Sequence, residues 1–371
     1  MHHGSQNIPS ELVTLVLADS SEHGISAALG LLESCALPDV IANDFSPAAT
    51  AAIATLIVAS IFLPITLKIL LARNVVDIPN ERSLHSAVTP RGGGIALAFG
   101  FTAGLLVVGP FSWPIWLSTL GYAGLGAWDD HKSRSAHLRL ILQTLIATAS
   151  SLWLVLALNM PLFTFVIGAL ILVCSVNAVN FMDGINGISA LHAIVWGIAY
   201  GFFFWLLELP EYIPLATILA AIGIAFLPWN IPRARLFLGD SGSYLIGGAV
   251  GSLALLGLLA SAPLAAICPL AIYAADTGAA LARRLRAGEK LTQAHKTHVF
   301  QQLVVNGWSH SRAATTTAIF TALTAGLGIL SLGRSPLIQS FVLVMVFLIC
   351  TLYLQLPRRL RNYKARTVEG D

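Results

Sequence analysis

The chain has 371 residues, of which 56% are hydrophobic and only 11% are charged. Soluble domains carry about 25% charged residues, so this composition excludes an ordinary soluble protein and indicates a chain surrounded largely by lipid. The net charge of +3 favours no acidic partner, and we expect no nucleic-acid partner. The cysteines lie far apart in the sequence, which excludes a disulfide framework and a CxxC metal site.

A membrane-spanning helix needs roughly 20 apolar residues. Eleven segments approach or reach that length, and short Gly and Pro breaks separate several of them. They are 47–71, 92–109, 112–128, 138–158, 160–177, 186–207, 212–229, 243–261, 263–282, 312–333 and 336–356. We therefore predict an all-α polytopic membrane bundle of eleven transmembrane helices over residues 46–357. Residues 1–45 form an N-terminal extension with no assigned role, and residues 358–371 a basic tail.

The basic residues are distributed unevenly between the two sides of the predicted bundle. Of the 21 Lys and Arg residues, only Arg334 falls outside one alternating set of loops and helix ends that includes the C-terminal tail. The positive-inside rule predicts that these loops and the C-terminus are cytoplasmic and that the N-terminus lies outside. Acidic residues at the same predicted face are Asp77, Glu81, Asp129, Asp130, Asp183, Asp240, Asp276 and Glu289. We therefore expect the polar chemistry at the cytoplasmic membrane surface.

Polar motifs begin in the first cytoplasmic loop. VVDIPNERSLHSAVTPRGGGIA carries Asn80 and His85 among basic residues, which either attract anionic headgroups or only set the topology. Next, Asp129 and Asp130 end an apolar segment in GAWDDHKSRSAHLRL. Adjacent carboxylates repel each other unless a positive group is near. They either form a solvated helix end with Lys132 as a counter-charge or handle Mg²⁺ or phosphate.

The stretch NAVNFMDGING follows one of the most apolar runs in the chain. Its spacing of three places Asn177, Asn180 and Asp183 on one helical face. These side chains offer more donors and acceptors than a turn requires, and the two glycines allow a ligand to approach the backbone. The stretch is therefore either a polar lip that holds a ligand or a polar C-cap.

Three further motifs lie near the ends of apolar segments. In RARLFLGDSGSYLIGG, Asp240 is either an N-cap or part of a phosphate site at a helix N-terminus, and Phe237 either stacks on a base or packs. Farther along, Asp276 precedes Arg283. The two residues belong either to a charge network near a phosphate or to a structural ion pair. His295 and His298 in AHKTHVFQQ suit pyrophosphate binding or are solvated, and a zinc site would need more ligands.

In their order along the chain, these motifs resemble the polyprenyl-phosphate N-acetylhexosamine-1-phosphate transferase family, glycosyltransferase family 4. The resemblance is carried by DIPNERSLH with PRGGG, WDDHK, NAVNFMDGING, FLGDSGS, DT with RR, and HKTH, over residues 68–310. It implies a polytopic helical bundle with a cytoplasmic-face active site in the bacterial inner membrane. It also implies transfer of a sugar 1-phosphate from a UDP-N-acetyl sugar to undecaprenyl phosphate, with release of UMP and with Mg²⁺, or alternatively Mn²⁺. Whether the chain forms a homodimer stays open.

The resemblance also assigns roles to individual residues. Asp240 is implied as a metal ligand, with Asp129 and Asp130 beside it, and Asp129 is also implied to deprotonate or align the lipid phosphate. The nucleotide is implied near Asn177, Asn180 and Asp183. The catalytic candidates are Asp129, Asp130, Asp183, His295 and His298. The substrate-binding candidates are Asn177, Asn180, Phe237, Lys132, Asn80, His85 and Arg283.

Two departures bear on the substrate. The branch that makes peptidoglycan precursors resembles DGLDG with a longer histidine cluster, whereas this chain has DGING, with Asn186, and HKTH. The departures favour the branch that initiates O-antigen, common-antigen or teichoic acid chains. They leave open N-acetylglucosamine, N-acetylfucosamine and N-acetylquinovosamine. A secondary transporter is the main alternative, but transporters place coupling residues near the bilayer midplane, which the ionisable residues here avoid.

Overall fold

The computed structural model describes residues 37–79, 84–108, 113–288 and 297–368. The chain divides into two units, Met1–Ser46 and Pro47–Asp371, and the description below concerns the second. Of the site candidates, Asn80 and His295 lie outside the described residues.

The predicted all-α fold is confirmed, because the elements are almost all helices. In chain order they are α3 (Leu37–Ala72), β1 (Val76–Asp77), β2 (Thr89–Pro90), α4 (Gly94–Val108), α5 (Trp113–His131), α6 (Ala136–Ala157), α7 (Thr164–Met182), α8 (Ile188–Leu206), η2 (Pro210–Tyr212), α9 (Ile213–Asn230), α10 (Gly239–Leu259), α11 (Pro263–Ile267), η3 (Cys268–Leu270), α12 (Ala271–Arg286), α13 (Val299–Val305), α14 (His310–Leu330) and α15 (Pro336–Val368). The strands pair antiparallel, with Val76 opposite Pro90.

Nine helices within the described residues are long and apolar enough to cross a membrane, which makes the chain a multi-pass membrane protein. One of the nine, Pro263–Arg286, is interrupted by the 3₁₀ turn η3 between α11 and α12. The helix α4 is apolar but has only 15 residues. Each of the eleven predicted segments overlaps a helix, and the count of eleven crossings stays a prediction.

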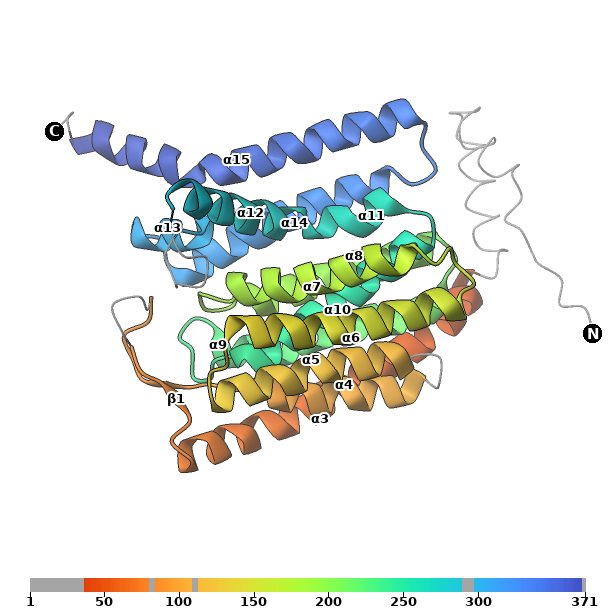
Figure 1. The fold of residues 1–371 in the computed structure, drawn as a ribbon, viewed down its shortest axis with the longest axis horizontal. Coiled ribbons are helices and arrows are strands. Elements are labelled where there is room, and N and C mark those ends of the chain that lie inside the picture. The colour runs from red at the N-terminus through yellow and green to blue at the C-terminus, as the bar shows by residue number, and fades with distance from the viewer. Residues whose placement is uncertain (1–36, 80–83, 109–112, 289–296, 369–371) are drawn as a thin grey trace, which may run out of the picture. The chain divides into compact units, whose positions relative to one another are not determined.

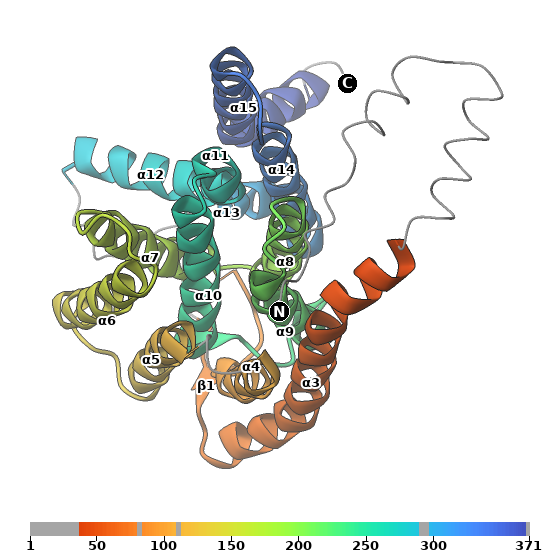
Figure 2. The same ribbon diagram turned by 90° about the vertical axis from the view of Figure 1, so that its right-hand side faces the viewer.

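The helix α10 forms the centre of the bundle and is buried along nearly its whole length (Figures 1 and 2). Small residues allow its neighbours to approach closely, as is usual between membrane helices. A Cβ atom on Gly247 would lie 2.6 Å from the Cα of Val176 on α7, and one on Gly126 of α5 would lie 2.2 Å from the carbonyl oxygen of Asp240. These contacts bring the ends of α5, α7 and α10 together.

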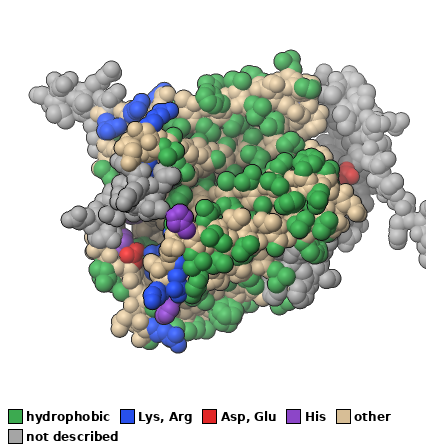
Figure 3. Space-filling model, in the orientation of Figure 1, with side chains coloured by type: hydrophobic (Ala, Val, Ile, Leu, Met, Phe, Trp, Pro, Cys, Tyr) green, Lys and Arg blue, Asp and Glu red, His purple; other side chains and the backbone are tan. Residues whose placement is uncertain are grey.

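The outer helices turn large apolar side chains outward. On α15, Leu337 and Phe347 are 81% and 69% exposed, as expected for a surface that faces lipid. In the space-filling view, apolar side chains cover the middle of the bundle, whereas Lys, Arg and His gather at one end (Figure 3). The loops at that end contain the sequence motifs, and its cytoplasmic location stays a prediction.

Candidate functional site

A polar cavity of about 320 Å³ opens at the end of the bundle where the basic residues gather. Segments from most of the chain contribute to it, and five of the predicted site residues line it. These five are His85, Asn180, Asp183, Phe237 and Asp240. The other lining residues are Asp77, Leu84, Arg91, Gly184, Ile185, Asn186, Asn230, Leu238, Gly239, Gln301 and His310.

Asp240 lies in the first turn of α10, where the helix begins at Gly239. Its Oδ1 atom accepts hydrogen bonds from the Arg91 guanidinium at 2.7 Å and from the Asn180 amide at 2.9 Å. The Asn180 amide also donates to the Ser243 hydroxyl at 3.0 Å. The side chain of Asp240 is only 12% exposed, so the carboxylate is held in a fixed place on the cavity wall.

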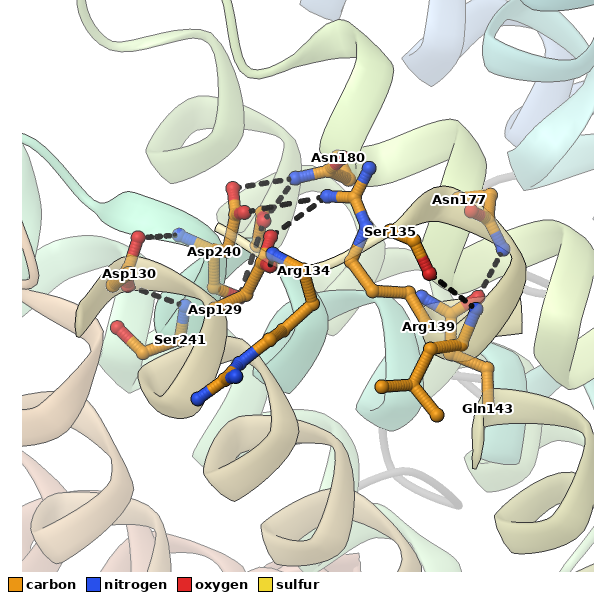
Figure 4. Close-up of polar contacts among 12 residues, drawn as sticks. Asp129, Asp130, Arg134, Ser135, Arg139, Gln143, Asn177, Asn180, Asp240 and Ser241 are labelled. Carbon is orange, nitrogen blue, oxygen red and sulfur yellow. Dashed lines mark hydrogen bonds and ion pairs between the residues drawn. The ribbon is translucent and has the colours of Figure 1, made fainter. Parts of the chain in front are cut away.

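Asp130 holds the start of α10. Its two carboxylate oxygens accept hydrogen bonds from the backbone N–H groups of Asp240 at 2.8 Å and Ser241 at 2.9 Å (Figure 4). The Arg91 guanidinium also donates to Asp130, at 3.0 Å. A carboxylate at this position satisfies unpaired N–H groups and complements the helix dipole. Gly239 has a φ of +75°, and a Cβ atom there would lie 2.6 Å from Asp130 Oδ2. Asp130 therefore positions Asp240.

Asp129 is buried beside Asp130 but points to a different partner. It accepts a hydrogen bond from the Arg139 guanidinium at 2.7 Å and one from the Arg134 backbone at 2.6 Å (Figure 4). Burial alone would raise the pKa of Asp129, but its hydrogen bonds with Asp240 and Arg134 and the charge of Arg139 hold that pKa below its ordinary value. Arg139 also lies 3.8 Å from Asp240. The Asp129 carboxylate is therefore ionised at neutral pH.

Arg91 joins two of these carboxylates. Burial would lower the pKa of its guanidinium, but the charges of Asp240 and Asp130 outweigh burial and raise that pKa. Arg91 is therefore a permanent cation at the cavity wall. Sequence analysis did not select it as a site residue, although the PRGGG run marks its place before α4.

The turn between α7 and α8 forms another wall. Asp183 accepts a hydrogen bond from the Ser189 hydroxyl at 2.7 Å. Burial raises the pKa of Asp183 to about 6, despite the lowering effects of Ser189 and Arg91. Gly187 has a φ of +81°, and its N–H donates to the Asn230 side chain. The Asn230 amide in turn donates to the Leu236 carbonyl at 3.0 Å, which ties this turn to the segment before α10.

Aromatic side chains lie at the outer wall of the cavity. The ring of His85 meets the ring of Phe237 edge-on, with 4.8 Å between centroids. His85 Nε2 is buried and has no hydrogen-bond partner within the described part of the chain. These rings offer an apolar surface to a planar ligand.

Asn177 points away from this cavity. Its amide donates to Gln143 of α6 at 2.7 Å and to the Val173 carbonyl at 2.8 Å (Figure 4). It lines instead a largely apolar groove of about 380 Å³ between α7 and the broken span of α11 and α12. Cys174, Phe181, Tyr273 and Gly278 also line this groove. The helix α7 therefore separates a polar cavity from an apolar groove.

Besides Asp129, Asp130 and Asn177, three further predicted residues do not line the cavity. His298 bonds to the buried Asp276 carboxylate at 3.3 Å rather than to a ligand site. The Arg283 guanidinium donates to the Thr297 carbonyl at 2.7 Å. Lys132 is exposed just beyond α5. Asp276 pairs with His298, and Arg283 donates to the Thr297 carbonyl instead of to Asp276.

Sequence analysis missed His310, Asn230 and Gln301. Each lies in the first or last turn of a helix and lines the cavity from a different part of the chain. Only the position of Asn230 at the end of an apolar segment gave a signal, and it was too common a feature to single out.

The carboxylates suit a hard cation. In the described residues, no three His, Cys, Asp or Glu side chains form a metal-binding group. However, Mg²⁺ in phosphoryl-transfer sites is usually held by one or two carboxylates together with substrate phosphates and water. Arg139 lies 2.7 Å from Asp129 and 3.8 Å from Asp240, so the two carboxylates are near each other and provide such a pair. These residues therefore fit a Mg²⁺ ion that would take its remaining ligands from phosphate oxygens and water.

Comparison with known proteins gives the family. Residues 112–258 match the family model of glycosyl transferase family 4. The chain is similar to a probable undecaprenyl-phosphate N-acetylglucosaminyl 1-phosphate transferase of Bacillus subtilis, with 26% identity over 70% of this chain and 77% of that protein. It is also similar to a phospho-N-acetylmuramoyl-pentapeptide-transferase of Moorella thermoacetica, with 32% identity over 57% of this chain and 74% of that protein.

A third relative is a decaprenyl-phosphate N-acetylglucosaminephosphotransferase of Mycolicibacterium smegmatis, with 28% identity over 64% of this chain and 70% of that protein. The matched family region runs from the start of α5 through α10 and so contains Asp129, Asp130, the α7–α8 turn and Asp240. The chain belongs to glycosyl transferase family 4.

Proposed function

We propose that this protein is a polyprenyl-phosphate hexosamine-1-phosphate transferase. It transfers an N-acetylhexosamine 1-phosphate from a UDP-sugar to undecaprenyl phosphate, which yields undecaprenyl-pyrophosphoryl sugar and UMP. The relatives carry names of this type. The observation that carries the proposal is the placement of Asp240, Arg91 and a helix N-terminus in one cavity at the polar end of a membrane bundle.

The polar cavity suits the nucleotide sugar. Arg91 supplies a fixed positive charge for a pyrophosphate, and Phe237 with His85 offers a surface on which a uracil ring stacks. Asn180 and Asp183 supply amide and carboxyl groups at the same wall. A cavity of about 320 Å³ is within the usual size range for small-molecule sites.

The apolar groove suits the lipid acceptor. It runs along α7 and α12, and Asn177 lines it one helical turn before Asn180 reaches Asp240. An isoprenoid chain in this groove would replace contacts with bilayer lipid, and its phosphate would reach the membrane surface near Asp129. This arrangement brings the two substrates together at the ends of α5, α7 and α10.

The reaction forms a bond between a phosphate oxygen of undecaprenyl phosphate and the sugar-bearing phosphorus of the UDP-sugar, and it breaks the bond from that phosphorus to UMP. Phosphoryl transfer depends mainly on alignment and charge stabilisation. Arg91 and Arg139 offset charge on the phosphates, and Asp130 fixes α10 and thus Asp240. Asp129 is ionised and held by Arg139, so it orients the acceptor phosphate or accepts its proton. Mg²⁺ held by Asp240 and Asp129 would neutralise pyrophosphate charge.

The sugar distinguishes two pathways. The departures in DGING and HKTH favour a donor such as UDP-N-acetylglucosamine and the initiation of a surface polysaccharide. The second candidate is the cell-wall precursor reaction, which is favoured by similarity to a phospho-N-acetylmuramoyl-pentapeptide-transferase. Both use the same cavity, so the donor decides between them.

The test measures UMP release by the purified protein in lipid nanodiscs with undecaprenyl phosphate, Mg²⁺ or Mn²⁺, and a panel of UDP-sugars that includes UDP-N-acetylmuramoyl-pentapeptide. We expect release that requires both lipid and metal, that is fastest with a UDP-N-acetylhexosamine, and that is lost in Asp240→Asn. Glu211→Gln, at the other end of the bundle, is the matched control. If the folded protein releases UMP with none of the donors, the proposal is overturned.

A further inference from the structure

His310 is the first residue of α14, and its imidazole lies between two walls of the cavity. Its Nδ1 atom is 3.2 Å from the backbone nitrogen of Asn186, in the α7–α8 turn. Its Nε2 atom is 3.2 Å from the carbonyl oxygen of Leu84, in the loop between β1 and β2. The ring therefore joins segments that are more than a hundred residues apart in the sequence.

The two partners determine the tautomer. A backbone N–H is only a donor, so Nδ1 must accept from Asn186. A carbonyl oxygen is only an acceptor, so Nε2 must carry the proton and donate to Leu84. Only the neutral Nε2–H imidazole makes both bonds, because an imidazolium has two donors and no acceptor. Both bonds therefore need one acceptor and one donor on the same side chain.

Each bridged segment carries residues that face the proposed donor. Leu84 directly precedes His85, whose ring meets Phe237, and the same connection leads to Arg91. Asn186 lies between Asp183 and Gly187, in the turn that forms the opposite wall. A change in the separation of these segments would therefore change the width of the cavity between the aromatic wall and Asp183.

We propose that His310 is a positioning residue, and that it sets the width of the nucleotide cavity by linking the Leu84 carbonyl to the Asn186 amide. It need not contact the reacting phosphates. Its effect falls on binding of the UDP-sugar, because the segments that it links line the donor cavity and not the apolar groove. The kinetic part of this inference rests on the proposed function, whereas the link itself does not.

The experiment compares His310→Gln, His310→Lys and His310→Ala. Glutamine keeps one acceptor and one donor, lysine keeps only donors, and alanine keeps neither. In hydrogen–deuterium exchange by mass spectrometry, we expect the peptide over residues 183–189 to exchange about tenfold faster in the Lys and Ala variants, as loss of a half-buried hydrogen bond implies. His310→Gln should stay close to the parent protein.

The kinetic readout separates positioning from general damage. We expect His310→Lys and His310→Ala to raise KM for the UDP-sugar about tenfold, with KM for undecaprenyl phosphate unchanged and with rescue by His310→Gln. Ser309→Ala removes the side-chain cap of α14 but leaves the imidazole, and His137→Ala removes an exposed histidine. Both controls should retain parental exchange over 183–189.

The outcomes are distinguishable. If exchange over 183–189 is the same in all His310 variants, the link does not hold the turn and the inference fails. If Lys and Ala variants exchange faster but the parent protein releases no UMP with any donor, the link stands and the proposed function fails. If Ser309→Ala reproduces the effects of His310→Ala, loosening of the α14 start explains them and the positioning role is overturned.

Discussion

Adjacent residues in this site do different work because of helix geometry. Consecutive side chains on a helix point about 100° apart. Asp129 therefore reaches Arg139 on α6, whereas Asp130 reaches the N-terminus of α10 and Arg91. The pair DD reads as one motif in the sequence, but in the structure its first carboxylate pairs with Arg139 and its second supports the helix that carries Asp240.

Asp130→Asn tests this division at the residue scale. An asparagine has one acceptor oxygen, so one of the N–H groups of Asp240 and Ser241 would lose its partner and Arg91 would lose an ionic contact. We expect a loss of about 1–3 kcal/mol in the free energy of unfolding, together with a loss of UMP release. Chemical denaturation in nanodiscs measures the change in the free energy of unfolding. Asp240→Asn should abolish release while keeping the helix cap, so equal destabilisation by the two changes would contradict a capping role.

The α7–α8 turn gives a pH prediction. The pKa of Asp183 is raised by burial from its ordinary 3.8 to about 6. Between these values the folded protein binds more protons at this position than the unfolded chain does, so its contribution to stability falls as the pH rises. We expect the slope of unfolding free energy against pH over this window to be less negative in Asp183→Asn than in the parent protein. An unchanged slope would show that Asp183 titrates normally.

At the scale of whole elements, α7 separates the polar cavity from the apolar groove. Its Asn180 faces α10 and its Asn177 faces α6 and the apolar groove. The spacing of three predicted that both lie on one helical face, but in the structure the two side chains contact different neighbouring helices. The periodicity of a single helix does not show where one neighbouring helix ends and another begins, so it could not divide the two asparagines between sites.

The groove can be filled without disturbing the cavity. A Cβ atom on Gly278 of α12 would meet no atom within 4 Å, and Gly278 lines the groove. We expect Gly278→Leu to raise KM for undecaprenyl phosphate and to leave KM for the UDP-sugar unchanged. Gly326→Leu on α14 is the matched control, since a Cβ atom there also meets no atom within 4 Å and Gly326 does not line the groove. An equal effect of the two substitutions would contradict a lipid site in the groove.

A buried polar junction joins α12, α13 and α15. The Asp276 carboxylate accepts from the Val299 backbone at 3.0 Å and from the Tyr353 hydroxyl at 3.0 Å, and it meets His298. We expect Tyr353→Phe to reduce the free energy of unfolding by about 1 kcal/mol and Asp276→Ala to reduce it by more, because the latter leaves several buried donors unpaired. The ring of Phe320 packs against the ring of Tyr353. Phe320→Leu is therefore the control for packing lost around Tyr353.

At the scale of the molecule, the sequence was sufficient for the fold class. Long apolar runs report the free energy of insertion into a bilayer, a local property, so hydropathy located the helices. The site depends instead on contacts between distant segments. Asp130 and Asp240 are 110 positions apart, and His310 and Leu84 are 226 apart. Family resemblance gave five of the cavity residues, but the bridging roles of Asp130, Arg91 and His310 follow only from helix packing.

Orientation is the property of the whole molecule on which the mechanism depends, because a UDP-sugar is made in the cytoplasm. The distribution of Lys and Arg predicts that Lys132 is cytoplasmic and that Glu211, at the opposite end, is external. Both residues are exposed, so each accepts a cysteine without disturbing the core. In a variant with the native cysteines replaced, a membrane-impermeant maleimide added to intact cells should label Glu211→Cys at once and Lys132→Cys only after permeabilisation. Because the cavity opens at the Lys132 end, the reverse labelling would place Asp240 on the side of the membrane without donor and would contradict the proposed reaction.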